Sequence, residues 1–95
     1  MRENTQEIIS LQDELEIIYW YYLKIQEKIW SILDTHNEIL KINERKPNYE
    51  TTRQIANVLF DLSKKNTEYQ KISQNFLIQT ERLRKKELEI LNKLN

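Results

Sequence analysis

Glycine and cysteine are both absent from the 95 residues, and Pro47, near the midpoint, is the only proline. Without glycine, the chain lacks the residue that most readily forms tight turns and phosphate-binding loops. Without cysteine, it has neither disulfides nor thiolate metal ligands. The remaining composition is rich in Leu, Ile, Glu, Lys and Gln, most of which are strong helix formers. The sequence therefore predicts an all-α protein that acts through the surfaces of its helices.

A surplus of charge of one sign is also lacking, because 15 basic residues balance 15 acidic residues. Residues 1–46 carry a net charge of −3 and residues 47–95 a net charge of +3. The overall balance argues against nucleic-acid binding, whereas the opposite signs of the two halves favour a chain that folds back on itself. The longest apolar run, residues 17–23, is too short to cross a bilayer, and no signal-peptide pattern is present. We expect a bacterial or phage protein made in the cytoplasm, without membrane insertion.

The first half of the sequence carries a continuous heptad pattern. Asn4 followed by Glu7 is typical of a helix start, and apolar residues then recur at alternating steps of three and four. We therefore predict a first helix over residues 4–45. The apolar positions of its seam up to residue 32 are Ile8, Leu11, Leu15, Ile18, Tyr22, Ile25, Ile29 and Ile32.

Pro47 divides the chain, because proline cannot donate a backbone hydrogen bond and pushes the preceding residue out of the helical region. We predict a turn at Glu44–Asn48, residues 46–48 at its centre, and a second helix over residues 49–94, capped by Asn48 or by Thr51. Its seam is Ile55, Leu62, Tyr69, Phe76, Leu83 and Ile90, with polar companion positions at Asn66, Thr80 and Glu87. The predicted fold is a single antiparallel two-helix hairpin over residues 1–95. Folding about Pro47 places Ile18 near Phe76.

Four consecutive aromatic residues, Tyr19-Trp20-Tyr21-Tyr22, form the aromatic cluster. Successive helical residues point about 100° apart, so the four rings must surround the helix. Tyr22 belongs to the seam, whereas Trp20 and Tyr21 are expected to face solvent in an isolated hairpin. Large exposed aromatic side chains indicate a protein interface, either with a second copy or with a different protein. The predicted partner-binding residues are Tyr19, Trp20, Tyr21, Leu23, Trp30, Leu33, Phe60 and Leu77.

No pattern for catalysis, cofactor binding or metal binding is present. His36 is the only histidine, and its position on the seam indicates a packing role near the turn. Helical chorismate mutases use buried arginines and lysines, but no basic residue lies on the first seam between Ile8 and Ile32. The basic residues around Arg82 and Lys86 are expected to pair with Asp13 and Glu14 across the hairpin. We predict that the protein is not an enzyme.

The length and the two-helix pattern resemble the W-x-G helical hairpins of type VII secretion, with Trp30-Ser31-Ile32 in place of the W-x-G motif. A closer resemblance is to the small helical accessory proteins of LXG toxins. This resemblance is carried by the hairpin form, the aromatic residues of the first helix and the charged segment from Phe76 to Glu87. It implies a targeting factor or chaperone that binds the helical N-terminal domain of a toxin, together with a second small helical hairpin, and is exported with this client.

Two alternatives stay open. The first is a self-associating coiled-coil scaffold, a homodimer or four-helix bundle that buries Trp20 and Tyr21 in a symmetric oligomer. The second is a helical bundle resembling the bacteriocin immunity proteins. Such a bundle needs more than one turn, so an interruption near Asn66 or Asn75 would favour it over a hairpin.

Overall fold

The computed structural model describes residues 2–32 and 47–95, and the side chains of these residues from Thr5 onward. Helices α1 (Arg2–Ile32), α3 (Tyr49–Leu62) and α4 (Thr67–Leu94) account for nearly all of the described chain, and no strand occurs in these residues. The molecule is elongated, with principal extents of 56 × 24 × 16 Å. The all-α class predicted from the sequence is therefore confirmed.

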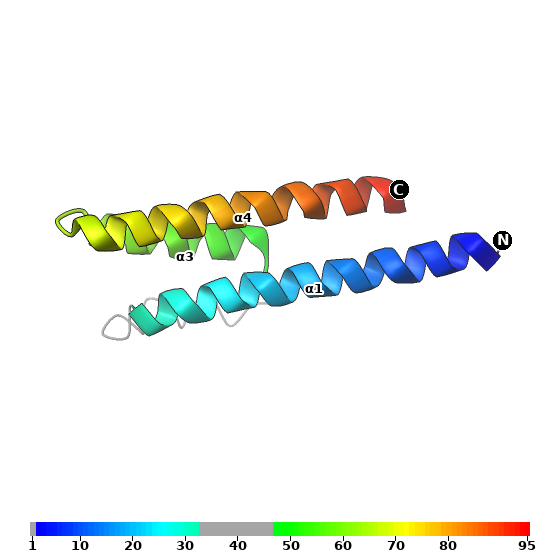
Figure 1. Cartoon of the computed structure of the whole chain (residues 1–95), viewed down its shortest axis with the longest axis horizontal. Helices are drawn as coiled ribbons and strands as arrows, with labels where there is room; N and C mark the ends of the chain where they lie inside the picture. The colour runs from blue at the N-terminus through cyan, green and yellow to red at the C-terminus, as the bar shows by residue number, and fades with distance from the viewer. Residues whose placement is uncertain (1, 33–46) are drawn as a thin grey trace.

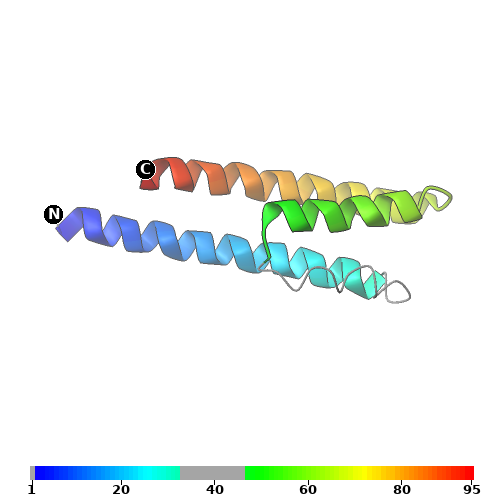
Figure 2. The same ribbon diagram turned by 180° about the vertical axis from the view of Figure 1, so that it is seen from behind.

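α1 and α4 run antiparallel along the length of the molecule, with the two chain ends at the same end (Figure 1). α3 lies between them on one side and runs in the same direction as α1, as both views show (Figure 2). α3 covers only the half of the α1–α4 pair that is farther from the chain ends. Three helices therefore pack together in one half of the described structure, and two helices in the other.

The predicted two-helix hairpin is not confirmed, because the segment expected as one helix from residue 49 to residue 94 forms α3 and α4. Ser63 ends α3: its backbone N–H and its hydroxyl donate to the carbonyl oxygen of Leu59, at 3.0 and 2.6 Å. Asn66 then caps α4, and its side-chain oxygen accepts from the N–H groups of Glu68 and Tyr69. No described residue has a positive φ, so this connection forms without glycine.

α1 begins at Arg2, two residues before the predicted start at Asn4, and its described part ends at Ile32. The predicted continuation of this helix to residue 45, His36, and most of the turn predicted at Glu44–Asn48 lie outside the described residues. Asn48 caps α3 as predicted. Its side-chain oxygen accepts from the N–H of Thr51 at 2.8 Å, and the Thr51 hydroxyl accepts from the N–H of Asn48, which completes a capping box.

The core consists of two clusters that follow the two halves of the molecule. The cluster in the three-helix half contains Ile25, Ile29, Ile55, Ala56, Leu59 and Phe76. The cluster in the two-helix half contains Leu11, Leu15, Ile18, Tyr22 and Ile90. The seam of α1 is thus buried from Leu11 to Ile29, as its heptads predict, although Ile8 is exposed. On the second seam, Leu62 and Tyr69 are exposed, contrary to expectation.

The predicted pairing of the two seams is wrong. Ile18 packs in the cluster that contains Ile90, whereas Phe76 packs with Ile25 and Ile29. The physical reason is the break at Ser63–Asn66, where the chain reverses direction, so that α4 lies antiparallel to both α1 and α3 (Figure 1). The polar positions Thr80 and Glu87 of α4 consequently lie in the interior.

Asn48→Ala should lower the free energy of unfolding by about 1 kcal/mol, because it leaves the first N–H groups of α3 without their side-chain acceptor. The matched control is Asn57→Ala, which changes an exposed asparagine in the middle of the same helix. Urea denaturation followed by circular dichroism measures both variants. Equal effects of the two substitutions would contradict the capping role of Asn48.

Candidate protein-binding surfaces

The aromatic cluster surrounds α1 as its spacing predicts. Tyr22 is 0% exposed and belongs to the core, whereas Tyr19, Tyr21 and Trp20 are 37%, 48% and 53% exposed. Tyr22 packs in the cluster that contains Ile90 of α4, and Tyr49, the first residue of α3, also packs against this cluster. The sequence predicts that Tyr22 lies on the buried seam and that Trp20 and Tyr21 face solvent. Their exposed fractions agree with this expectation.

Neighbouring side chains position the Trp20 ring. Tyr21 lies edge-on to it, with 5.6 Å between the ring centroids and an interplanar angle of 69°. The Lys24 ammonium lies 4.9 Å from the centroid of the Trp20 ring and also forms an ion pair with Glu27 at 3.5 Å. These contacts restrict the rotamers of a large exposed side chain, so that less entropy is lost when a partner covers it.

The other predicted partner-binding residues are less exposed than the aromatic cluster. Trp30 and Leu77 pack against the core cluster of the three-helix half, and Leu23 and Phe60 are half-buried. The indole Nε1 of Trp30 is buried and finds no acceptor among the described residues. Leu33 lies outside the described residues. The structure therefore brings together Trp20 and Tyr21 in one exposed surface, whereas Tyr19 points about 200° away from Tyr21 and Trp30 packs against the core.

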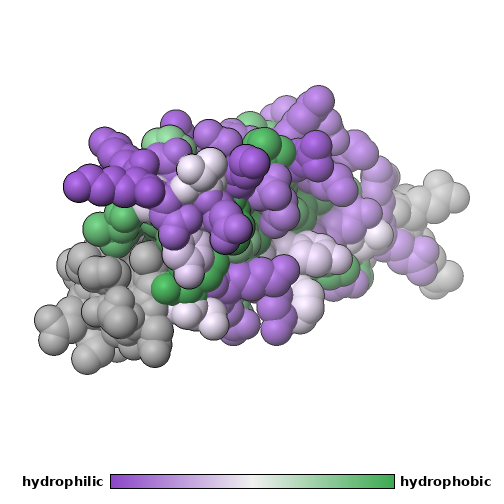
Figure 3. Space-filling model, turned by 60° about the vertical axis from the view of Figure 1, so that its left-hand side comes forward, coloured by the Kyte–Doolittle hydropathy of each residue, from purple (hydrophilic) through white to green (hydrophobic). Residues whose placement is uncertain are grey.

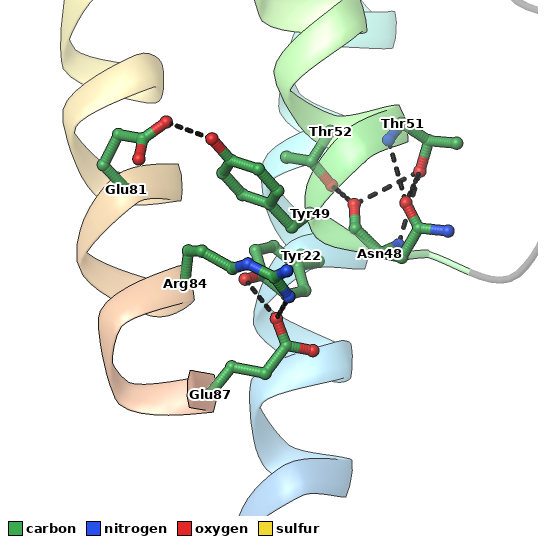
Figure 4. A network of polar contacts seen from close by, with 8 residues as sticks. All are labelled: Tyr22, Asn48, Tyr49, Thr51, Thr52, Glu81, Arg84 and Glu87. Carbon is green, nitrogen blue, oxygen red and sulfur yellow. Dashed lines mark hydrogen bonds and ion pairs between the residues drawn. The ribbon is translucent and has the colours of Figure 1, made fainter. Parts of the chain in front are cut away.

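A polar network joins the three helices where α3 begins (Figure 4). Tyr22 donates its hydroxyl hydrogen to the buried Glu87 carboxylate at 3.1 Å, and Arg84 pairs with the same oxygen at 2.9 Å. Tyr49, the first residue of α3, donates to Glu81 at 2.6 Å, and the Arg84 guanidinium lies 5.0 Å from its ring centroid. These contacts hold Tyr22 of α1 and Tyr49 of α3 against one face of α4, and thereby fix the position of the three helices along one another.

This network changes the proton affinity of its members. Burial raises the pKa of Tyr22, and the charge of Glu87 adds to the effect. The hydrogen bond to Glu81 raises the pKa of Tyr49, and the hydrogen bond to Glu87 raises the pKa of Arg84. All three groups therefore keep their protons at neutral pH, where the phenols act as donors and the guanidinium as a cation.

A second surface is the hollow between α1 and α4, which we call the α1–α4 groove. It consists of two adjoining hollows of about 400 and 370 Å³, lined by α1 and α4 without any α3 residue. Gln26 donates to Thr51 and Thr52 of α3, and Lys24 and Lys28 each lie two residues away, which is about 200° around the helix. The groove is therefore on the side opposite α3. Its apolar floor consists of Ile17, Ile18, Tyr21, Ile25, Leu83 and Ile90.

Most charged side chains along this groove have no ion-pair partner within the described part of the chain. Lys24, Lys28 and Arg82 lie at one end and Lys86 lines both hollows, and among these four only Lys24 has an ion pair. The predicted interhelical pairing of the α4 cations with Asp13 and Glu14 is absent from the described residues, where Arg84 pairs within α4 and Arg53 approaches Glu81 at 4.0 Å. The register found in the structure explains this, because Arg82 lies near Lys24 and Lys28 rather than near Glu14.

Sequence reasoning missed the groove, although a signal was available. Ile17 lies outside the predicted seam of the first helix, yet it shares a helix face with Tyr21, Lys24 and Lys28 at steps of four, three and four. The face also changes from acidic at Glu14 to basic at Lys28. Hydrophilic side chains dominate the view in Figure 3, with hydrophobic groups reaching the surface between them.

The described residues contain no cluster of metal-ligating side chains. Within the same residues, no helix is long and apolar enough to cross a membrane. Comparison of the chain with protein-family models, curated proteins and solved structures found no match. The exposed helix surfaces are therefore the features that point to a function.

Tyr22→Phe should lower the free energy of unfolding by about 1–2 kcal/mol, because the buried Glu87 carboxylate loses one of its two hydrogen-bond donors. Tyr49→Phe removes an exposed bond to Glu81 and should cost less than about 0.5 kcal/mol. Urea denaturation of the two variants measures this difference, and an effect of Tyr49→Phe as large as that of Tyr22→Phe would contradict it.

Stability should fall as the pH rises above about 10. A tyrosine of the unfolded chain ionises near this pH, whereas the pKa of Tyr22 in the folded chain is raised. The unfolded state then binds fewer protons than the folded state, so the free energy of unfolding decreases with increasing pH. Denaturation at several alkaline pH values should show a shallower decrease for Tyr22→Phe than for the wild type, and parallel curves would refute this contribution.

Proposed function

We propose that the chain is a non-enzymatic protein-binding adaptor that packs the aromatic side chains of α1 against helices of a client protein. The observation that carries this proposal is the exposure of Tyr19, Trp20 and Tyr21 on a helix whose seam is otherwise buried. Tryptophan and tyrosine are the side chains that most often dominate the binding energy of protein interfaces. A surface of this kind recognises an apolar or mixed helix face.

The energetics favour an interface over a purely structural role for these rings. Each aromatic side chain buries about 150–250 Å² when fully covered, and Trp20 contributes little to the core while it is 53% exposed. Its ring is oriented by Tyr21 and Lys24. A client that covers the ring gains apolar burial without first having to order the side chain.

The predicted client is the helical N-terminal domain of an LXG toxin, for which this protein would act as a targeting factor or chaperone in type VII secretion. A second small helical hairpin belongs to the same prediction. The resemblance supports it through the aromatic residues of α1 and the charged end of α4. On this reading the protein starts in the cytoplasm and leaves the cell with its client.

A specific observation favours a second candidate, a helical protein resembling the bacteriocin immunity proteins. The interruption at Ser63–Asn66 occurs at one of the two places where it would favour such a bundle over a hairpin. In this case the client is a bacteriocin-related protein. Both candidates need a protein-binding helix surface, so the identity of the client distinguishes them.

Trp20→Ala should weaken client binding about tenfold or more, because the substitution removes the largest exposed side chain of α1. The experiment is a tagged pull-down from the native cell, with the wild type and the variant compared by quantitative mass spectrometry. The matched control is Ile78→Ala, which truncates an apolar side chain of similar exposure, 49%, on α4. Trp30 is left unchanged because it packs against the core, where a substitution would also affect folding.

Each outcome of this pull-down has a defined meaning. A client lost with Trp20→Ala and kept with Ile78→Ala supports the adaptor proposal, and a toxin or a bacteriocin-related client then decides between the two candidates. A client retained equally by all three proteins would overturn the placement of the site at Trp20. Recovery of the tagged chain alone, as a discrete oligomer, would replace the adaptor with the self-associating scaffold.

A further inference from the structure

The α1–α4 groove leaves apolar and charged groups uncovered on the side opposite α3. Within its apolar floor, Tyr21, which lines both hollows, is 48% exposed, and Ile17, in the hollow that contains Glu14, is 54% exposed. One end of the groove is basic, and the other end carries Glu14 and Glu89 with Lys93. A surface with an apolar middle, a basic end and an end that carries carboxylates can be complementary to the same surface of a second copy.

The residue order on α1 has the symmetry that such a contact requires. Tyr21 lines both hollows and so marks the middle of the groove on α1, with Glu14 seven residues before it and Lys28 seven residues after it. Reversing the helix about Tyr21 exchanges Glu14 with Lys28 and Ile17 with Ile25. Two copies of α1 placed antiparallel would therefore oppose unlike charges at both ends and apolar groups in the middle.

The residues of α4 that line the other side of the groove have the same symmetric order. Lys86 lines both hollows and therefore marks the middle, with Arg82 toward the basic end and Glu89 toward the acidic end. The same reversal brings Arg82 of one copy to Glu89 of the other. Lys86 lies close to the two-fold axis, where its long aliphatic stem can cover apolar surface while the ammonium extends into water.

We propose that two copies of the chain form a two-fold symmetric dimer through the α1–α4 groove, with α1 against α1 and α4 against α4, each pair antiparallel. Only a two-fold axis that lies in the contact plane and is perpendicular to the helices exchanges the two ends of the groove. An axis parallel to the helices would bring the two basic ends together, and the repulsion between their like charges disfavours this arrangement. The dimer contact then consists of two layers, each formed by α1 and α4 of one copy. The α3 helix of each copy lies on the outer side of its layer.

This inference does not depend on the client. It concerns the groove side of α1, whereas the adaptor proposal depends on Trp20, which lies outside the residues that line the groove. A monomeric chain can bind a client through Trp20, and a dimeric chain can lack one. The two proposals therefore fail in different experiments.

The test uses two charge-reversal variants of the full chain. The acidic-end variant carries Asp13→Lys and Glu14→Lys, and the basic-end variant carries Lys24→Glu and Lys28→Glu. In a homodimer of either variant both ends oppose like charges, whereas an equimolar mixture restores unlike charges at both ends. Sedimentation velocity over a concentration series measures the dissociation constant of each sample, and circular dichroism checks the helical content.

We expect the wild type to dimerise, with a dissociation constant that increases with salt, and each variant alone to dimerise at least about tenfold more weakly. The mixture should form a heterodimer, and the chain with all four substitutions should dimerise like the wild type. The matched control is Lys64→Glu with Lys65→Glu, an equal charge change in the exposed connection between α3 and α4, which should leave the dissociation constant unchanged.

Two results would overturn the proposal: a wild type that stays monomeric throughout the concentration series, or variants that associate as the wild type does. Lys24 also contacts Trp20 and Glu27, so its substitution can affect the helix locally. If the basic-end variant loses helical content, Lys28→Glu with Arg82→Glu replaces it, because neither residue forms an ion pair in the described chain. The mixture with the acidic-end variant then decides the outcome.

Discussion

The placement of α3 depends on one buried contact, the hydrogen bonds from the Gln26 side-chain amide to the hydroxyls of Thr51 and Thr52 at 3.1 and 2.9 Å. Gln26 is 1% exposed, and a buried amide without partners would cost more than the bonds contribute. The two threonines also belong to the turn that Asn48 caps. The start of α3 is thereby fixed beside Gln26, six residues before the last described residue of α1, and no shift along α1 preserves these bonds.

This position of α3 determines what the rest of the molecule can bury. A helix of 14 residues in this position covers only one half of the α1–α4 pair. It packs on the Gln26 side of α1, so no described helix covers the opposite side, where Ile17 and Tyr21 are exposed. The exposed surfaces of α1 are therefore a consequence of the architecture rather than of isolated residue choices.

The helices could be predicted from the sequence more fully than their arrangement. The heptads of α1 identify its buried seam, because burial along one helix depends only on its own period. The same heptads fit any partner shifted by seven residues, so the pairing of Ile18 with the region of Ile90 could not be read from them. Glu87 appeared as a weak position because its partner Tyr22 lies 65 residues away in sequence. Asn66 offered a cap signal for the break, but nothing nearby in sequence required it to be used.

Tyr21 connects the two proposed surfaces. Its ring lines the groove and also contacts Trp20, so a client that covers both rings competes with a second copy for Tyr21. In that case only the monomer binds the client, and the apparent affinity for the client is reduced by the fraction of chain that is dimeric. By the same linkage, client binding dissociates the dimer. Self-association would then protect the apolar middle of the groove until a client is present, which is a useful property for a small helical protein with large exposed aromatic side chains.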